Sequence, residues 1–207
     1  MTALEQSLVA FTLAAALLTI TPGLDTALVL RTAAAEGPKR ALAAAAGICL
    51  GCLAWGALVA LGLGMLLQAS ELAYLALKWI GAAYLLYLGL QMILVPRNEE
   101  AGSEAAAPAK SNWFLRGLLT NLLNPKVGVF YVSFLPQFIP AGGDVATTTL
   151  LLASIHAGLG LAWFGLLVAA TRPIARALRN GRLVRGLDRA TGGVLLFFGL
   201  RLALSRD

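Results

Sequence analysis

Residues 19–25 have the sequence Thr-Ile-Thr-Pro-Gly-Leu-Asp, and they interrupt an apolar run that extends from about residue 8 to residue 30. An apolar run of about 20 residues is long enough to cross a membrane as one helix. Pro22 lacks an N–H and clashes with the preceding turn, and Gly23 leaves the backbone free to change direction. Asp25 then adds a carboxylate. Because a broken backbone and a charge are tolerated at membrane depth only inside protein or beside a polar cavity, this stretch predicts a substrate or ion site.

The composition is that of an integral membrane protein. Of the 207 residues, 59% are hydrophobic and 13% are charged, whereas a soluble domain averages about 45–50% and about 25%. The net charge of +6 does not indicate nucleic-acid binding, because the basic residues cluster in short connectors between apolar runs. The N-terminus lacks the basic region of a cleaved signal peptide, so we expect the first apolar run to be retained.

Six apolar segments are each long enough to span a bilayer. They cover about 6–30, 41–67, 72–95, 113–138, 146–171 and 187–204. The polar, proline-bounded stretch at 96–112 predicts a linker. We therefore expect an all-α protein with one membrane domain, made of a three-span repeat at 1–95, a cytoplasmic linker at 96–112 and a second three-span repeat at 113–207.

Lys and Arg residues are concentrated in the first, third and fifth connectors, and the two connectors on the opposite side have none. The positive-inside rule therefore predicts that both termini are periplasmic. Since each repeat has three spans, the two repeats would be inserted in opposite directions.

The break is duplicated. Pro22 lies in the first segment of one repeat and Pro125 in the first segment of the other, within Asn121-Leu-Leu-Asn124-Pro125-Lys126. Paired broken segments at corresponding positions of two inverted repeats are the best sequence indication of a transporter's binding site.

Asp25 and Lys126 are the charges nearest the middle of their segments. A charge at the bilayer centre costs about 2.5–3.5 kcal/mol, and two opposite charges in one cavity would offset much of that. One hypothesis is a site for a zwitterion, in which Lys126 attracts a carboxylate and Asp25 either attracts an ammonium or carries a proton. The alternative is a buried ion pair that only locks the two repeats together.

Polar neighbours surround both breaks. Asn121 and Asn124 either contact substrate or cap the broken backbone. Thr19 and Thr21 are expected to bond back to their own helix. Half-helices that begin after Pro22 and Pro125 would present N–H groups to a carboxylate.

Three further polar residues are candidates for the cavity. His156, the only histidine, is either a proton relay or, as we favour, a residue satisfied by a neighbouring helix. Tyr84 and Tyr87 lie deep in their segment and either pack or line a cavity.

The second segment is rich in small residues. Gly47 and Gly51 form a helix-packing motif that we expect to act within the chain. Cys49 and Cys52 are interpreted as small packing residues, and a membrane thiol-redox protein is the alternative. We expect no metal, because four-ligand zinc needs partners that the chain does not offer, and no other cofactor.

Several motifs together resemble the LysE/RhtB family of bacterial exporters of lysine, homoserine, threonine, leucine and related compounds. They are Thr21-Pro22-Gly23-x-Asp25, Gly37-x-x-Arg40-Ala41, the run from Gly81 to Gly89, Asn121-x-x-Asn124-Pro125-Lys126 and Phe134-Leu-Pro-Gln-Phe138. The similarity covers nearly the whole chain, in order. The chain departs from the family at Leu24, where the family often has Pro. Because the family uses either Asn or Asp at position 25, Asp25 is not expected to be an obligatory proton carrier.

The resemblance implies an inner-membrane secondary transporter, not an enzyme, that exports an amino acid or derivative by proton antiport. A passive channel or a cation/metal transporter of the same superfamily is the alternative. The sequence leaves the oligomeric state open, with a homodimer as one option.

Overall fold

The computed structural model describes residues 2–69, 71–95, 112–170 and 181–204. All elements in these ranges are helical, as predicted. They are α1 (Ala3–Ile20), α2 (Leu24–Glu36), α3 (Pro38–Ala69), α4 (Glu71–Leu94), α5 (Trp113–Leu122), α6 (Pro125–Val129), the π-helix η1 (Phe130–Phe134), the 3-10 helix η2 (Leu135–Phe138), α7 (Val145–Ala169) and α9 (Gly181–Leu204). The predicted linker at 96–112 lies, except for Asn112, outside the described residues.

Both breaks occur where the sequence predicts them. Helix α1 ends at Ile20, and α2 begins after Pro22 and Gly23. Helix α5 ends at Leu122, and Pro125 occupies the first turn of α6, where its missing N–H costs nothing. The predicted segment 113–138 is more irregular than expected, because α6 continues directly into the π-helix and the 3-10 helix.

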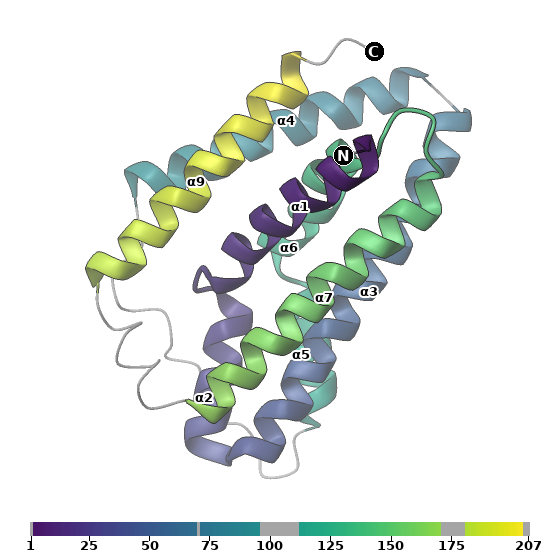
Figure 1. Ribbon diagram of the computed structural model, residues 1–207. Helices are drawn as coiled ribbons and strands as arrows, with labels where there is room; N and C mark the ends of the chain where they lie inside the picture. The colour runs from purple at the N-terminus through teal and green to yellow at the C-terminus, as the bar shows by residue number, and fades with distance from the viewer. Residues whose placement is uncertain (1, 70, 96–111, 171–180, 205–207) are drawn as a thin grey trace.

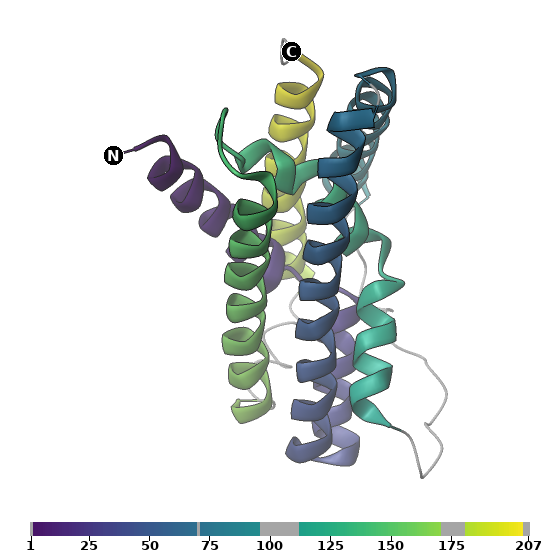
Figure 2. The same cartoon turned by 90° about the vertical axis from the view of Figure 1, so that its right-hand side faces the viewer.

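Two pairs of antiparallel helices frame the molecule. Helices α3 and α7 run side by side in opposite directions (Figure 2), and α5 packs along α3. Helices α4 and α9 form a second antiparallel pair, and α1 lies between this pair and α7 (Figure 1). Residues of both breaks lie beside α3 and α7, and the first break also contacts α9 through Thr21.

Glycines let these helices approach closely. A Cβ at Gly47 would overlap the carbonyl oxygen of Phe114, and one at Gly117 would overlap that of Ala44. The Gly-x-x-x-Gly motif on α3 thus packs against α5 within the chain, as expected. Gly51, one turn beyond Gly47, leaves room for the side chain of Asn121.

Three helical stretches among the described residues are long and apolar enough to cross a membrane. They are Ala3–Ile20, Pro38–Gly62 and Val145–Ala169. Trp79–Leu94 is apolar but shorter, and the break before Pro125 leaves α5 with 10 residues and α6 with five. Helix α9 begins with several charged residues. The six-span arrangement therefore stays a prediction.

Some boundaries differ from those predicted. Helix α2 continues to Glu36, beyond the predicted end of the first segment at about residue 30, and α9 begins at Gly181 rather than near 187. In both cases the helix extends past the apolar run into polar residues, which a search for apolar segments does not capture.

Candidate functional site

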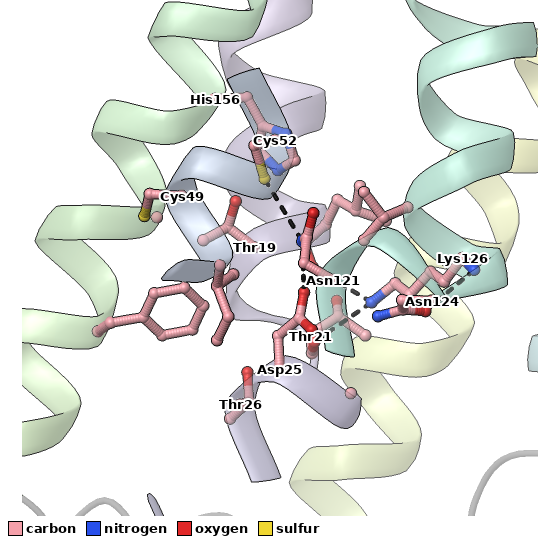
Figure 3. Close-up of a pocket in the computed structure, with 16 residues that line it drawn as sticks. Thr19, Thr21, Asp25, Thr26, Cys49, Cys52, Asn121, Asn124, Lys126 and His156 are labelled. Atoms are coloured by element: carbon pink, nitrogen blue, oxygen red, sulfur yellow. Dashed lines mark hydrogen bonds between the residues drawn. The ribbon is translucent and has the colours of Figure 1, made fainter. Parts of the chain in front are cut away.

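A cavity of about 50 Å³ lies where the two breaks meet (Figure 3). Its lining comes from α1, α2, α3, the second broken segment and α7. The predicted site residues that line it are Thr21, Gly23, Asp25, Asn121, Asn124, Lys126 and His156. Since a water molecule takes about 30 Å³ in the liquid, the cavity as it stands has room for one or two waters.

Asp25 and Asn121 bring the two breaks into direct contact. The Nδ2 group of Asn121 donates to Asp25 Oδ2 at 2.9 Å and to Cys52 Sγ at 3.6 Å. Asp25 lies in the first turn of α2, where the helix dipole favours a negative charge. The other carboxylate oxygen, Oδ1, is buried and has no hydrogen-bond partner within the described chain.

Lys126 makes the reciprocal connection. Its Nζ atom donates to the carbonyl oxygens of Leu18 and Thr21, at 3.3 Å each. These carbonyls belong to the last turn of α1, whose final acceptors have no partner inside the helix. Each break is therefore bonded by a side chain from the other half of the chain. Lys126 also lies close enough to interact electrostatically with Asp25.

The remaining polar groups at the breaks mostly satisfy the backbone. Thr19 Oγ1 donates to the carbonyl of Ala15 and Thr21 Oγ1 to that of Leu17, both at 2.7 Å, as expected for back-bonding threonines. Asn124 Oδ1 accepts from the backbone N–H of Lys126 at 3.1 Å and so caps α6.

Thr191 on α9 is a contact that the sequence did not indicate. Its hydroxyl shares a hydrogen bond of 2.5 Å with Thr21 Oγ1, and both side chains are buried. The first break is thus tied to the last helix of the chain. An ordinary threonine among apolar and charged residues carries no local signal of this role.

His156 is satisfied by a neighbouring helical segment, as favoured from the sequence. Its Nδ1 atom lies 3.0 Å from the hydroxyl of Tyr131, which is fully buried in η1. His156 also lines the cavity. A π-helical turn of this kind often occurs at functional sites, and here it places Tyr131 behind the cavity wall.

Cys49 and Cys52 are buried free thiols on α3 that line the same cavity. Cys49 also packs near Gly160 of α7, so the packing role expected from the sequence is present as well. Within the described ranges, no three His, Cys, Asp or Glu residues are grouped so that they could hold a metal ion.

The two tyrosines proposed from the sequence lie elsewhere. Tyr84 lines a second, larger cavity, whose lining shares Asn124 with the first. Tyr87 lines neither cavity, and its side chain is 59% exposed.

Comparison with known proteins identifies the family. The family model described as LysE type translocator matches residues 16–206. The chain belongs to the LysE translocator family. Proteins of this family are transporters rather than enzymes, and this assignment does not favour the thiol-redox or metal-transport alternatives.

Curated relatives of this LysE translocator are similar over almost their whole length. An uncharacterised membrane protein of Bacillus subtilis is 32% identical, over 96% of this chain and 99% of its own. A homoserine/homoserine lactone efflux protein of Salmonella typhimurium is 31% identical, over 95% and 96%. A threonine efflux protein of Escherichia coli is 34% identical, over 90% and 92%. No solved structure matches the chain.

Proposed function

We propose that this LysE translocator exports an amino acid or an amino-acid derivative as a secondary transporter of the bacterial inner membrane. The observation that carries the proposal is the buried Oδ1 atom of Asp25, which has no hydrogen-bond partner within the described chain, in a residue that lines the same cavity as Lys126. An ammonium group offers three N–H donors and a carboxylate only acceptors. The unpaired acceptor on Asp25 matches the ammonium end of a zwitterion. The cationic Lys126 in the same cavity matches its carboxylate end.

Each site residue has a role in this proposal. Asp25 receives the substrate ammonium, and Asn121 holds the carboxylate of Asp25 in place. The Nζ atom of Lys126, which lies at the end of α1, faces the substrate carboxylate. Thr21, Pro22, Gly23, Asn124 and Pro125 shape the backbone of the two breaks. Because about 50 Å³ is too small for an amino acid, the two halves must rock apart to admit it, as in alternating access.

The packing supports two inverted repeats, 1–95 and 113–207, with six spans in all. The second helices of the two repeats, α3 and α7, pack together antiparallel, and so do the third helices, α4 and α9. The first helix of each repeat packs on the second helix of the other, α1 on α7 and α5 on α3. A pseudo-two-fold axis in the membrane plane would produce this exchange.

Charge supports the orientation with periplasmic termini. Figure 2 shows the α2–α3 connection and the start of α5 at one end of the molecule, with the start of α1 and the end of α9 away from that end. The α2–α3 connection is followed by Lys39 and Arg40, and Arg116 lies in the first turn of α5. Basic residues near span ends favour the cytoplasmic side.

Coupling to the proton-motive force is the part of the proposal that rests on the family resemblance. Proton coupling predicts that a protonophore stops export while the substrate gradient is intact. A passive channel would continue to release substrate down its gradient after the same treatment.

The experiment is a screen of amino acids that accumulate outside cells overproducing the protein, compared with its Lys126→Ala variant. We expect at least one amino acid to accumulate with the wild type and about 100-fold slower release with Lys126→Ala, since a hydrogen bond to a charged group contributes about 1.5–3 kcal/mol. Lys39→Ala, which removes an exposed lysine outside the cavity, is the matched control and should export normally. Equal export by Lys126→Ala and the wild type, at equal membrane abundance, would reject the proposed site.

A further inference from the structure

Asn121 on α5 connects α2 and α3 at the first cavity. Its Nδ2 group donates to Asp25 Oδ2 on α2 and to Cys52 Sγ on α3, and Figure 3 shows Asn121 between these two residues. Asn121 is only 1% exposed, so its side chain cannot turn out into solvent. Whatever fixes the amide of Asn121 therefore also fixes the carboxylate of Asp25.

Gly51 on α3 leaves the space that the Asn121 side chain occupies. A Cβ atom at Gly51 would lie 2.5 Å from Asn121 Oδ1 and 2.9 Å from both the Cβ and the Cγ of Asn121. The three nearest atoms thus all belong to one side chain, and any residue larger than glycine would displace it. Because Asn121 Nδ2 is bonded to Asp25 Oδ2, the displacement would disturb the carboxylate as well.

Cys52 favours the orientation in which the N–H₂ end of the Asn121 amide faces Asp25. The carboxylate of Asp25 and the sulfur of Cys52 are both acceptors, and only the N–H₂ end of an amide can donate to them. The other end, Asn121 Oδ1, accepts no hydrogen bond from the described residues and lies where Gly51 has no side chain. The reversed amide would place its oxygen against a carboxylate oxygen, which repels it.

We propose that Gly51 and Cys52 are positioning residues for the substrate ammonium. They act through Asn121, which binds Oδ2 of Asp25, while Oδ1 has no hydrogen-bond partner within the described chain and receives the ammonium. The proposal rests on the proposed function, because it needs the ammonium at Asp25. It gives α3 a role in substrate affinity, although neither residue bonds the substrate itself.

The first test displaces the side chain of Asn121 by adding one methyl group. Uptake of labelled threonine and of labelled leucine is measured in inside-out membrane vesicles, whose cytoplasmic face is outward. We expect Gly51→Ala to raise the half-saturating concentration of the transported amino acid about tenfold, since a misplacement of about 1 Å can cost about 100-fold. Gly62→Ala makes the same change on the same helix, where nothing lies within 4 Å of a Cβ, and should leave the value as in the wild type.

A pair of substitutions at Cys52 tests the second acceptor and keeps the test decisive if Gly51→Ala is not inserted. Cys52→Ala removes the acceptor and should raise the half-saturating concentration about threefold, as expected for the loss of one hydrogen bond. Cys52→Ser keeps an acceptor and should return the value to within about twofold of the wild type.

The kinetic parameter that changes separates positioning from packing. A packing role alone would lower the maximal rate or the amount of protein in the membrane instead. Asn121→Gly removes all three atoms that a Cβ at position 51 would meet, so adding Gly51→Ala to it should raise the half-saturating concentration no further.

Three results would overturn this inference alone. They are an unchanged half-saturating concentration in Cys52→Ala, a fall only in the maximal rate in Gly51→Ala, and a further rise in the double variant. Wild-type vesicles that transport no amino acid would overturn the proposed function and this inference with it.

Discussion

Replacing Asp25 with Ala is expected to lower amino-acid export by about 100-fold or more at unchanged membrane abundance. The substitution removes the acceptor proposed for the substrate ammonium and leaves the Nδ2 group of Asn121 without its carboxylate partner. A hydrogen bond to a charged group contributes about 1.5–3 kcal/mol, and about 1.4 kcal/mol corresponds to a factor of ten. The measurement is release from preloaded cells, with the protein quantified by immunoblot.

Two companion variants sharpen this result. Asp25→Asn keeps an oxygen acceptor but cannot carry a proton, so it should retain part of the export if Asp25 binds the ammonium. Loss as complete as in Asp25→Ala would instead assign proton transfer to Asp25. Asp144→Asn is the control, because Asp144 caps α7 at an exposed position and an Asn can accept the same N–H from Thr147. Wild-type export by Asp25→Ala would contradict the proposed site.

Gly117→Leu is expected to remove most of the folded protein from the membrane. Even a Cβ at Gly117 would overlap the backbone of Ala44, and Gly47 is in the same position against Phe114, so α3 and α5 must separate to accept any larger side chain. Overpacking a well-packed contact costs about 1–3 kcal/mol or more. For a chain of this size we expect the unfolding midpoint in detergent to fall by about 10 °C.

The measurement is the midpoint of thermal aggregation in detergent, followed by size-exclusion chromatography. Gly158→Leu on α7 is the matched control, because nothing lies within 4 Å of a Cβ built there. An unchanged midpoint in Gly117→Leu would show that α3 and α5 do not pack as described.

The breaks and the helical fold could be predicted from the sequence because their causes are local. Pro22 and Pro125 interrupt helices through their own missing N–H groups, and Gly47 and Gly51 indicate close packing by their spacing. The partners of these elements could not be predicted. Lys126 bonds to carbonyls at the end of α1, and this contact depends on how the two halves meet.

Three other features of the site could not be predicted, because the sequence around them carries no local signal. Cys49 and Cys52 line the cavity, but the sequence of α3 gives no polar side from which its rotation could be inferred. The π-helix from Phe130 to Phe134 has no Pro or Gly of its own, so its altered hydrogen bonding has no signal in the sequence. Thr191 resembles any other threonine until the fold brings it to Thr21.

The central claim is that the two broken segments meet around a cavity that water and substrate enter, and the two native cysteines test it directly. The chain has only Cys49 and Cys52, and both line this cavity. Membranes holding the protein are treated with a small water-soluble methanethiosulfonate reagent, and the rate of labelling is followed by mass spectrometry of the intact protein. We predict that the thiols are labelled as the cavity opens and that substrate at about ten times its dissociation constant slows labelling about tenfold. No labelling in membranes, despite full reaction after denaturation, or labelling at a rate that substrate does not change, would contradict the account.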